Sequence, residues 1–138
     1  MTSFSKHQKY LSDLLDTIKL SRPVYGVRII AAIVYKNRII SIGTNSVKTD
    51  PFQARFNSNE KIYLHAETST IKQALRLLDL DTLAETSMYI ARAKWTSGNR
   101  TSMIPGLAKP CVGCQKALLT FNIEKVYYTL EGEGSGTL

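Results

Sequence analysis

The stretch VRIIAAIVYKNRIISIG, residues 27–43, decides the fold class of this chain. It contains two runs rich in β-branched residues, 27–35 and 39–43, separated by the three polar residues KNR. Such runs are typical of strands, and a short polar break between them predicts two antiparallel strands joined by a tight turn. The sequence therefore places a β-hairpin early in the chain, with the other elements arranged around it.

Helices and further strands are expected on both sides of this hairpin. Apolar residues recur at helical spacing over residues 5–20, which predicts an amphipathic helix before it. After it, the sequence predicts a helix over 64–78, a strand over 87–93, a helix from residue 111 and a fourth strand over 124–130. This order, αββαβαβ, predicts a three-layer α/β/α sandwich with a mixed sheet of four to five strands.

The chain of 138 residues is expected to form a single domain over residues 1–138. Two long polar segments, 44–61 and 94–109, are expected to be functional loops, because loops of this length are unusual in a small domain. The glycine-rich end, EGEGSGTL over 131–138, is expected to be a flexible tail or at most a short strand. A sheet edge left uncovered there would favour pairing of subunits, so a homo-oligomer is expected.

The composition is that of a globular protein with a basic surface. Hydrophobic residues make up 43% of the chain, and 18 lysines and arginines against 11 acids give a formal net charge of +7. Acid-free basic stretches over 17–49 and 86–123 favour an anionic ligand, either a nucleotide or a nucleic acid. The sequence has no apolar run of about 20 residues and no apolar leader, so no membrane association is expected and a cytoplasmic location is favoured.

Two short motifs contain three of the four histidines and cysteines in the chain. The segment YLHAETST places His65 and Glu67 two apart, and KPCVGC places Cys111 and Cys114 three apart. The chain has only two histidines and two cysteines, yet one histidine and both cysteines fall at two expected helix starts. Cysteines at positions i and i+3 share a helix face, so both sulfurs can reach one ion.

These residue types suit a zinc ion bound by two thiolates and one imidazole, with a fourth position open for water. The partial positive charge of the helix N-termini helps to hold the cysteines as thiolates. Residues two apart lie about 200° apart around a regular helix, so Glu67 shares a cavity with His65 only if His65 stands at the helix entrance. A glutamate beside the metal suits proton transfer. A C-x-x-C redox pair and a buried structural histidine are the competing interpretations.

The combination of HAE with PCVGC resembles the zinc-dependent cytidine/deoxycytidylate deaminase superfamily, whose signature is H-x-E followed by P-C-x-x-C. The resemblance covers most of the chain, because the expected order of elements is also similar to that of the family. It implies a cytidine-deaminase-like sandwich in which one catalytic Zn²⁺ is held by His65, Cys111 and Cys114. It also implies hydrolytic deamination, in which Glu67 moves a proton from the attacking water to the base and then to the departing amine.

The resemblance extends to residues that would contact the substrate. The segment IGTNS is similar to the family's Gly-x-Asn, which implies that Asn45 hydrogen-bonds the sugar or base, and the main chain of Ala66 resembles a contact with the base carbonyl. In the two long segments, Lys48 is expected to contact a phosphate and Trp95 to stack on a base. A turn role for Asn45 and a Trp95 folded over its own loop are the structural alternatives.

Three functions are compatible with the sequence. The compact chain favours deamination of cytosine to uracil in a free nucleoside or nucleotide, with basic side chains bound to a phosphate. The charge of +7, the two basic segments and Trp95 favour instead a deaminase acting on cytosine or adenine within single-stranded DNA or RNA. The third is a non-catalytic zinc-binding protein of the same fold, and the intact Glu67 argues against it.

Overall fold

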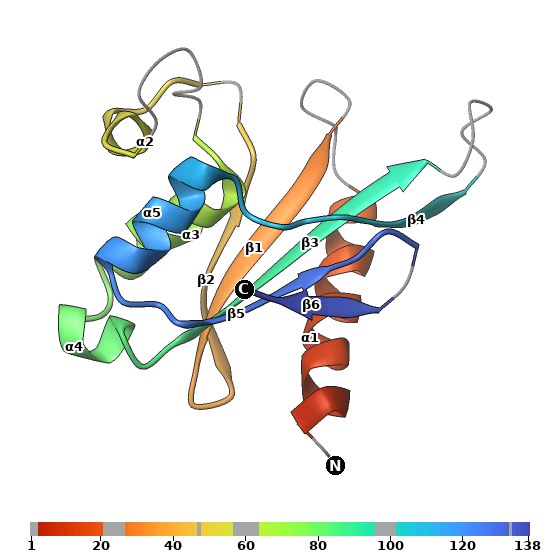
Figure 1. Ribbon diagram of the computed structural model, residues 1–138, viewed down its shortest axis with the longest axis horizontal. Helices are drawn as coiled ribbons and strands as arrows, with labels where there is room; N and C mark the ends of the chain where they lie inside the picture. Colours follow the sequence, from red (N-terminus) through yellow and green to blue (C-terminus); the bar gives the residue numbers. More distant parts are fainter. Residues whose placement is uncertain (1–2, 21–26, 47, 57–63, 96–101, 133) are drawn as a thin grey trace.

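The structure is a computed structural model that describes residues 3–20, 27–46, 48–56, 64–95, 102–132 and 134–138 (Figure 1). Its elements, in chain order, are α1 (Ser3–Lys19), β1 (Arg28–Tyr35), β2 (Arg38–Thr44), α2 (Pro51–Ala54), α3 (Ala66–Ala74), α4 (Leu80–Leu83), β3 (Ser87–Trp95), β4 (Met103–Gly106), α5 (Val112–Thr120), β5 (Lys125–Thr129) and β6 (Ser135–Thr137). None of the described helices is long and apolar enough to cross a membrane.

The strands form one mixed sheet in the order β2-β1-β3-β5-β6, with β4 paired to β3. Helix α1 covers one face, and α3 and α5 cover the other (Figure 1). Side chains on β1 alternate between two cores, as expected for a strand buried on both faces. Ile30, Ala32 and Val34 pack in the core under α1. Ala31 and Ile33 pack in the core under α3 and α5, so the predicted three-layer α/β/α sandwich is confirmed.

The predicted hairpin is present as β1 and β2, which pair antiparallel from Ile30 opposite Thr44 to Tyr35 opposite Arg38. Its turn places Lys36 and Asn37 at positive φ angles of 48° and 63°. Two successive left-handed residues are typical of the tight turn that matches the twist of paired strands. The polar break between the two β-branched runs therefore does form the turn that the sequence predicts.

The sheet has six strands, where the sequence predicts four to five. Strand β4 lies in a segment expected to be loop because it contains Pro105 and Gly106, and it pairs with the far end of β3. Strand β6 lies in the segment expected to be a flexible tail or at most a short strand, and it pairs antiparallel with β5. Gly136 is needed there, since a Cβ would lie 2.7 Å from the Tyr128 ring. Main-chain pairing with an existing edge, rather than side-chain hydrophobicity, accounts for both added strands.

The 44–61 segment, which is expected to be a loop, contains the short helix α2. Helix α2 begins after Asp50, whose side chain accepts a hydrogen bond from the Phe52 N–H at 2.8 Å. The Phe52 and Phe56 rings are buried and lie within 6.3 Å of the Phe121 ring on the α5 side of the sheet. This aromatic cluster fixes the position of α2 and Phe56.

The edge of β3 that faces away from β1 is shared by two strands. Residues Ser87–Ile90 pair with β5 in parallel, whereas Arg92–Trp95 pair with β4 antiparallel. Thr129 lies where the two strands meet, and its hydroxyl donates to the Gly106 carbonyl at 2.6 Å while accepting from the Arg92 N–H at 3.1 Å. The end of β3 is therefore firmly positioned next to the segment that leads into α5.

Gly43 allows β2 to touch the backbone of α3. A Cβ at this position would lie 2.6 Å from both the Ala66 carbonyl oxygen and the Thr70 nitrogen. Because neither backbone group can move alone, we expect Gly43→Ala to lower the free energy of unfolding by about 1–3 kcal/mol. Urea unfolding would measure this loss. The matched control is Thr44→Ala at the next, exposed position, which is expected to change stability by less than about 0.5 kcal/mol. Equal stability of the two variants would contradict the close approach.

Candidate active site

His65 occupies the N-cap position of α3 with extended backbone angles, φ −82° and ψ 163°. Its main-chain N–H donates to the Gln53 side-chain oxygen at 3.1 Å and to the Thr68 hydroxyl oxygen at 3.2 Å. Gln53 comes from α2 and is fully buried, so the helix entrance is held from outside the helix. His65 therefore stands where a histidine and a glutamate two residues apart can face the same cavity.

The two cysteines are placed by α5 against His65. Cys111 is the N-cap residue of α5, and Cys114 lies fully buried in its first turn. The His65 Nδ1 atom lies 3.5 Å from the Cys111 sulfur and 3.3 Å from the Cys114 sulfur. The three ligand atoms all lie within 4.8 Å of one another. A tetrahedral zinc ion with ordinary bond lengths needs a nitrogen–sulfur separation of roughly 3.6 Å, so this donor set fits zinc in both chemistry and spacing.

The electrostatic environment of the cysteine pair favours ionisation of one of the two thiols, that of Cys111. The pKa of the Cys111 thiol is lowered to about 3, chiefly because the Cys114 thiol donates a hydrogen bond to its sulfur and also because His65 lies beside it. The pKa of Cys114 is raised by that same hydrogen bond and by burial. The single proton shared by the two sulfurs thus leaves one of them as a thiolate. Binding of a divalent cation favours loss of that proton and formation of the second thiolate.

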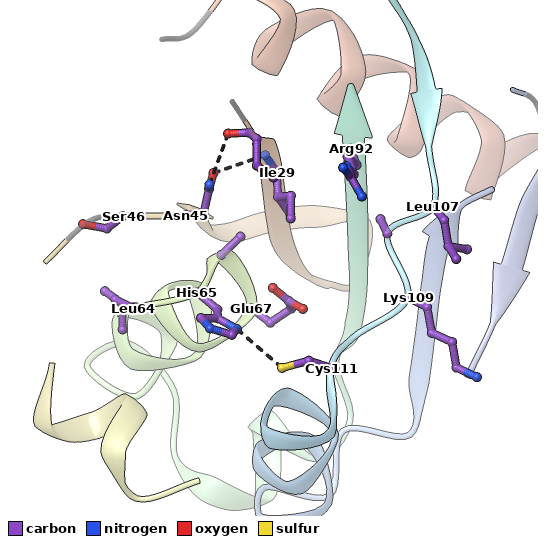
Figure 2. Close-up of a pocket in the computed structure, with 13 residues that line it drawn as sticks. Ile29, Asn45, Ser46, Leu64, His65, Glu67, Arg92, Leu107, Lys109 and Cys111 are labelled. Atoms are coloured by element: carbon purple, nitrogen blue, oxygen red, sulfur yellow. Dashed lines mark hydrogen bonds between the residues drawn. The ribbon is translucent and has the colours of Figure 1, made fainter. Parts of the chain in front are cut away.

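Glu67 lies in the first turn of α3 and is only 6% exposed. Figure 2 shows its carboxylate directed into the cavity, in the space between His65 and Cys111. Burial raises the pKa of this carboxyl group above its usual range. It does not belong to the three-residue group that could hold a metal among the described residues. The side chain therefore lies beside the group that could hold a metal and is not part of that group.

The cavity beside these residues has a volume of about 340 Å³ and an apolar wall. That size lies within the range of pockets for small ligands. Apart from the residues already described, its lining comes from the ends of β1, β2 and β3 and from the segment before α5. The lining residues are Val27, Ile29, Asn45, Ser46, Leu64, His65, Ala66, Glu67, Arg92, Leu107, Ala108, Lys109 and Cys111.

Asn45 connects two strands at the cavity wall. Its side-chain oxygen accepts from the Ile29 N–H at 3.2 Å, and its side-chain nitrogen donates to the Val27 carbonyl at 3.2 Å (Figure 2). An amide side chain has a further donor and a further acceptor position beyond these two bonds. Asn45 therefore fixes the backbone of β1, a structural role, and still has hydrogen-bonding capacity for a ligand.

The structure brings together most of the site residues predicted from the sequence, but not all of them. Asn45 and the buried Ala66 line the cavity with the metal-binding group and Glu67. Lys48 is exposed and does not line it. Trp95 does not line it either, and instead has the Arg28 guanidinium 5.5 Å from its ring centre at the end of β3. The structure therefore does not place Lys48 and Trp95 at the cavity, and their roles as substrate contacts stay predictions.

Three residues of the site were not predicted from the sequence. Gln53 supports His65 from α2, while Arg92 and Lys109 supply positive charge at the cavity. Arg92 follows the buried run of β3, and a charged residue at the end of a central strand is a usable signal. Gln53 gave no such signal, because its role depends on the contact that α2 makes with the start of α3.

A family model described as "Cytidine and deoxycytidylate deaminase zinc-binding region" matches residues 4–130. The chain belongs to this family. The family is named for zinc binding, and the His65, Cys111 and Cys114 group, found among the described residues, is consistent with one zinc ion. A comparison with curated protein sequences gave no match.

Solved structures of dCMP deaminase from the cyanophage S-TIM5 are similar to the chain. The apo form has a TM-score of 0.60 at 19% identity, covering 95% of this chain and 86% of that chain. The form in complex with dCMP and dUMP has a TM-score of 0.61 at 18% identity, covering 95% and 85%. Form 2 of Acinetobacter baumannii RibD has a TM-score of 0.53 at 16% identity, covering 94% of this chain and 29% of that chain. These likenesses establish the cytidine-deaminase-like sandwich fold.

Proposed function

We propose that this protein is a zinc-dependent hydrolytic deaminase that converts cytosine to uracil in a free nucleoside or nucleotide and releases ammonia. The observation that carries the proposal is the position of Glu67. Its buried carboxylate faces a ligand-sized cavity directly beside a His/Cys/Cys group, yet is not part of that group. A purely structural zinc site would need no acid there, and burying one without function is unfavourable.

The residues of the chain provide for each proton transfer of this reaction. When bound, zinc would position a water molecule and make it more acidic. Glu67 would accept one proton from the attacking water and deliver it to the ring nitrogen N3 as the oxygen adds to C4. It would then carry the second proton to the exocyclic amine, so that the C4–N4 bond breaks, the carbonyl forms and ammonia leaves. Water and the amine are thereby converted into the carbonyl and ammonia without any other reactant.

The cavity wall would orient the base for this attack. The main chain of Ala66, between the ligand histidine and the glutamate, would contact the base carbonyl, and the remaining donor and acceptor of Asn45 would contact the sugar. The apolar side chains of Val27 and Ile29 would pack against the ligand and limit the entry of bulk water. This arrangement supports positioning of a small ligand rather than a long strand.

A free nucleoside or nucleotide is better supported than a polynucleotide. The cavity volume of about 340 Å³ suits a single nucleotide, and neither Lys48 nor Trp95 lines it. A solved structure with the same fold, the cyanophage dCMP deaminase, binds dCMP and dUMP, which is the ligand class proposed here. Self-association and a cytoplasmic location stay predictions from the sequence.

A substrate panel read by mass spectrometry tests the proposal. It contains cytidine, deoxycytidine, their 5′-monophosphates, a cytosine-containing single-stranded DNA oligonucleotide and an adenosine-containing RNA. We expect a gain of about one mass unit in a free cytosine nucleoside or nucleotide, because the exchange replaces an amine by a carbonyl oxygen. Turnover of the oligonucleotide alone would contradict the free-substrate proposal. No turnover of any substrate by zinc-loaded protein would contradict the deaminase proposal.

A further inference from the structure

Arg92 carries a buried hydrogen-bond donor without a partner. Its Nε atom is the one buried side-chain nitrogen or oxygen in the described residues for which no acceptor is found. Buried donors are almost always paired in native proteins, and an unpaired one is unfavourable. Arg92 also lines the same cavity as Glu67 and Asn45. An acceptor supplied by a ligand would account for both observations.

The strand register places Arg92 on the same row of the sheet as Asn45. Ile29 lies opposite Arg92 in the β1–β3 pair. The Ile29 carbonyl also accepts a hydrogen bond from the Asn45 N–H, and the Ile29 N–H donates one to the Asn45 side-chain oxygen. Neighbouring strands are about 4.8 Å apart, so the Asn45 and Arg92 main chains are separated by roughly 10 Å across Ile29. A ligand that contacts Asn45 with its sugar therefore has its next substituent within reach of a long Arg92 side chain.

The Arg92 side chain is held over Gly106 of the adjacent strand. A Cβ on Gly106 would lie 3.1 Å from the Arg92 Cδ and 3.4 Å from its Nε, so a larger residue there would push the guanidinium aside. The Arg92 N–H donates a hydrogen bond to the Thr129 hydroxyl, which in turn donates one to the Gly106 carbonyl. The guanidinium is thus prepositioned by the β3–β4–β5 junction, and little side-chain entropy is lost when a ligand binds.

No acidic side chain in the described part of the chain neutralises the charge of Arg92. Lys94, two residues further along the same strand, forms an ion pair with Glu131, and Lys72 forms one with Asp50 at 2.8 Å. No such pair is found for Arg92 among the described residues. Glu67 is the one carboxylate that lines the cavity, and it is not ion-paired with Arg92. Lys109 also lines the cavity but is exposed, and Figure 2 shows its side chain pointing away from His65 and Glu67.

We propose that Arg92 binds the 5′-phosphate of the substrate, and that the enzyme therefore acts on cytosine nucleoside monophosphates in preference to nucleosides. This inference rests on the proposed function, which it makes more specific. A guanidinium presents donors in a planar fork that matches two phosphate oxygens, whereas a base carbonyl or a hydroxyl offers one acceptor. The Nε atom and one Nη atom of a guanidinium lie on the same edge and can contact two such oxygens together. The phosphate supplies both the missing acceptor and the missing negative charge.

Binding of the reaction products tests this inference without turnover. Isothermal titration calorimetry with zinc-loaded protein compares dUMP with deoxyuridine and UMP with uridine, and spans a range of salt concentrations. We expect the wild-type protein to bind the monophosphates roughly 10- to 100-fold more tightly than the nucleosides. Arg92→Gln is expected to abolish that difference while leaving nucleoside binding unchanged, which also shows that the variant is folded. Arg92→Lys, which keeps the charge but not the fork, is expected to recover only part of it.

Lys94→Gln is the matched control, because Lys94 lies on the same strand and its positive charge is already neutralised by Glu131. It is expected to change monophosphate binding by no more than about threefold. An equal loss of nucleoside and monophosphate binding in Arg92→Gln, or no loss of either, would overturn the inference. It would also be overturned by wild-type protein that binds a single-stranded oligonucleotide more tightly than UMP, with a steep salt dependence.

The two proposals fail in different ways. If no substrate is deaminated and Arg92→Gln still loses monophosphate binding selectively, the phosphate site stands and the proposed reaction fails. If cytosine nucleosides and their monophosphates are deaminated equally well and Arg92→Gln changes neither, the proposed reaction stands and the phosphate site fails.

Discussion

Glu67→Gln is expected to keep one equivalent of zinc and the native fold, and to lower kcat by a factor of about 10²–10⁴ or more. The amide has the size and polarity of the carboxylate, so the cavity shape is preserved. It cannot accept and return a proton, and the reaction needs two such transfers at the cavity occupied by this side chain. Mass-spectrometric turnover assays, with zinc quantified in the same samples, would measure both quantities.

Glu85→Gln is the matched control for this experiment, because it makes the same chemical change at an exposed glutamate outside the cavity. It is expected to leave kcat and zinc content unchanged. Glu67→Gln protein that retains zinc and turns over at a similar rate would contradict the assignment of Glu67 as the proton carrier. Loss of zinc in Glu67→Gln would instead indicate that this side chain supports the metal site.

The parts of the fold that could be predicted are those encoded by local side-chain periodicity. The hairpin over residues 27–43 and helix α1 both follow from apolar patterns within a few turns or a single strand pair. Strand β4 could not be predicted and β6 was predicted only as an alternative to a flexible tail, since their residues include Pro105 and Gly136 and they form by pairing with edges made elsewhere in the chain. A strand defined by its partner leaves little trace in its own sequence.

The site shows the same division between local and non-local information. His65 and Glu67 could be predicted because each belongs to a short motif at a helix start, where the spacing itself restricts the chemistry. Arg92 and Gln53 could not, because their positions at the site depend on strand register and on the contact between α2 and the start of α3. Lys48 and Trp95 were predicted from charge and aromatic character alone, and the structure does not place them at the cavity. Composition indicated an anionic ligand, but only the fold identifies Arg92 as a cation that lines the cavity and forms no ion pair with any described residue.

His65→Ala is expected to abolish stoichiometric zinc binding, and with it both activity and the stabilisation that the metal provides. A ligand that binds only the folded state stabilises it by about 4 kcal/mol when present at 1,000 times its dissociation constant. We therefore expect a chelator to lower the Tm of the wild-type protein substantially and to leave the Tm of His65→Ala unchanged. Differential scanning calorimetry with and without chelator, together with zinc quantification, would measure this.

His7→Ala is the matched control, because the chain has only one other histidine. His7 stacks on Tyr127 at 3.8 Å on the α1 side of the sheet, so its removal changes packing but not the metal site. This variant is expected to bind one equivalent of zinc and to respond to the chelator as the wild-type protein does.

The two cysteines are the only thiols in the chain, so a thiol-reactive dye gives an independent measurement. We expect both thiols to be protected by zinc in His7→Ala, and at least the exposed Cys111 to react rapidly in His65→Ala. Protection of both thiols in His65→Ala would contradict a metal site that depends on this imidazole, because two thiolates alone leave half of a tetrahedral site without protein ligands.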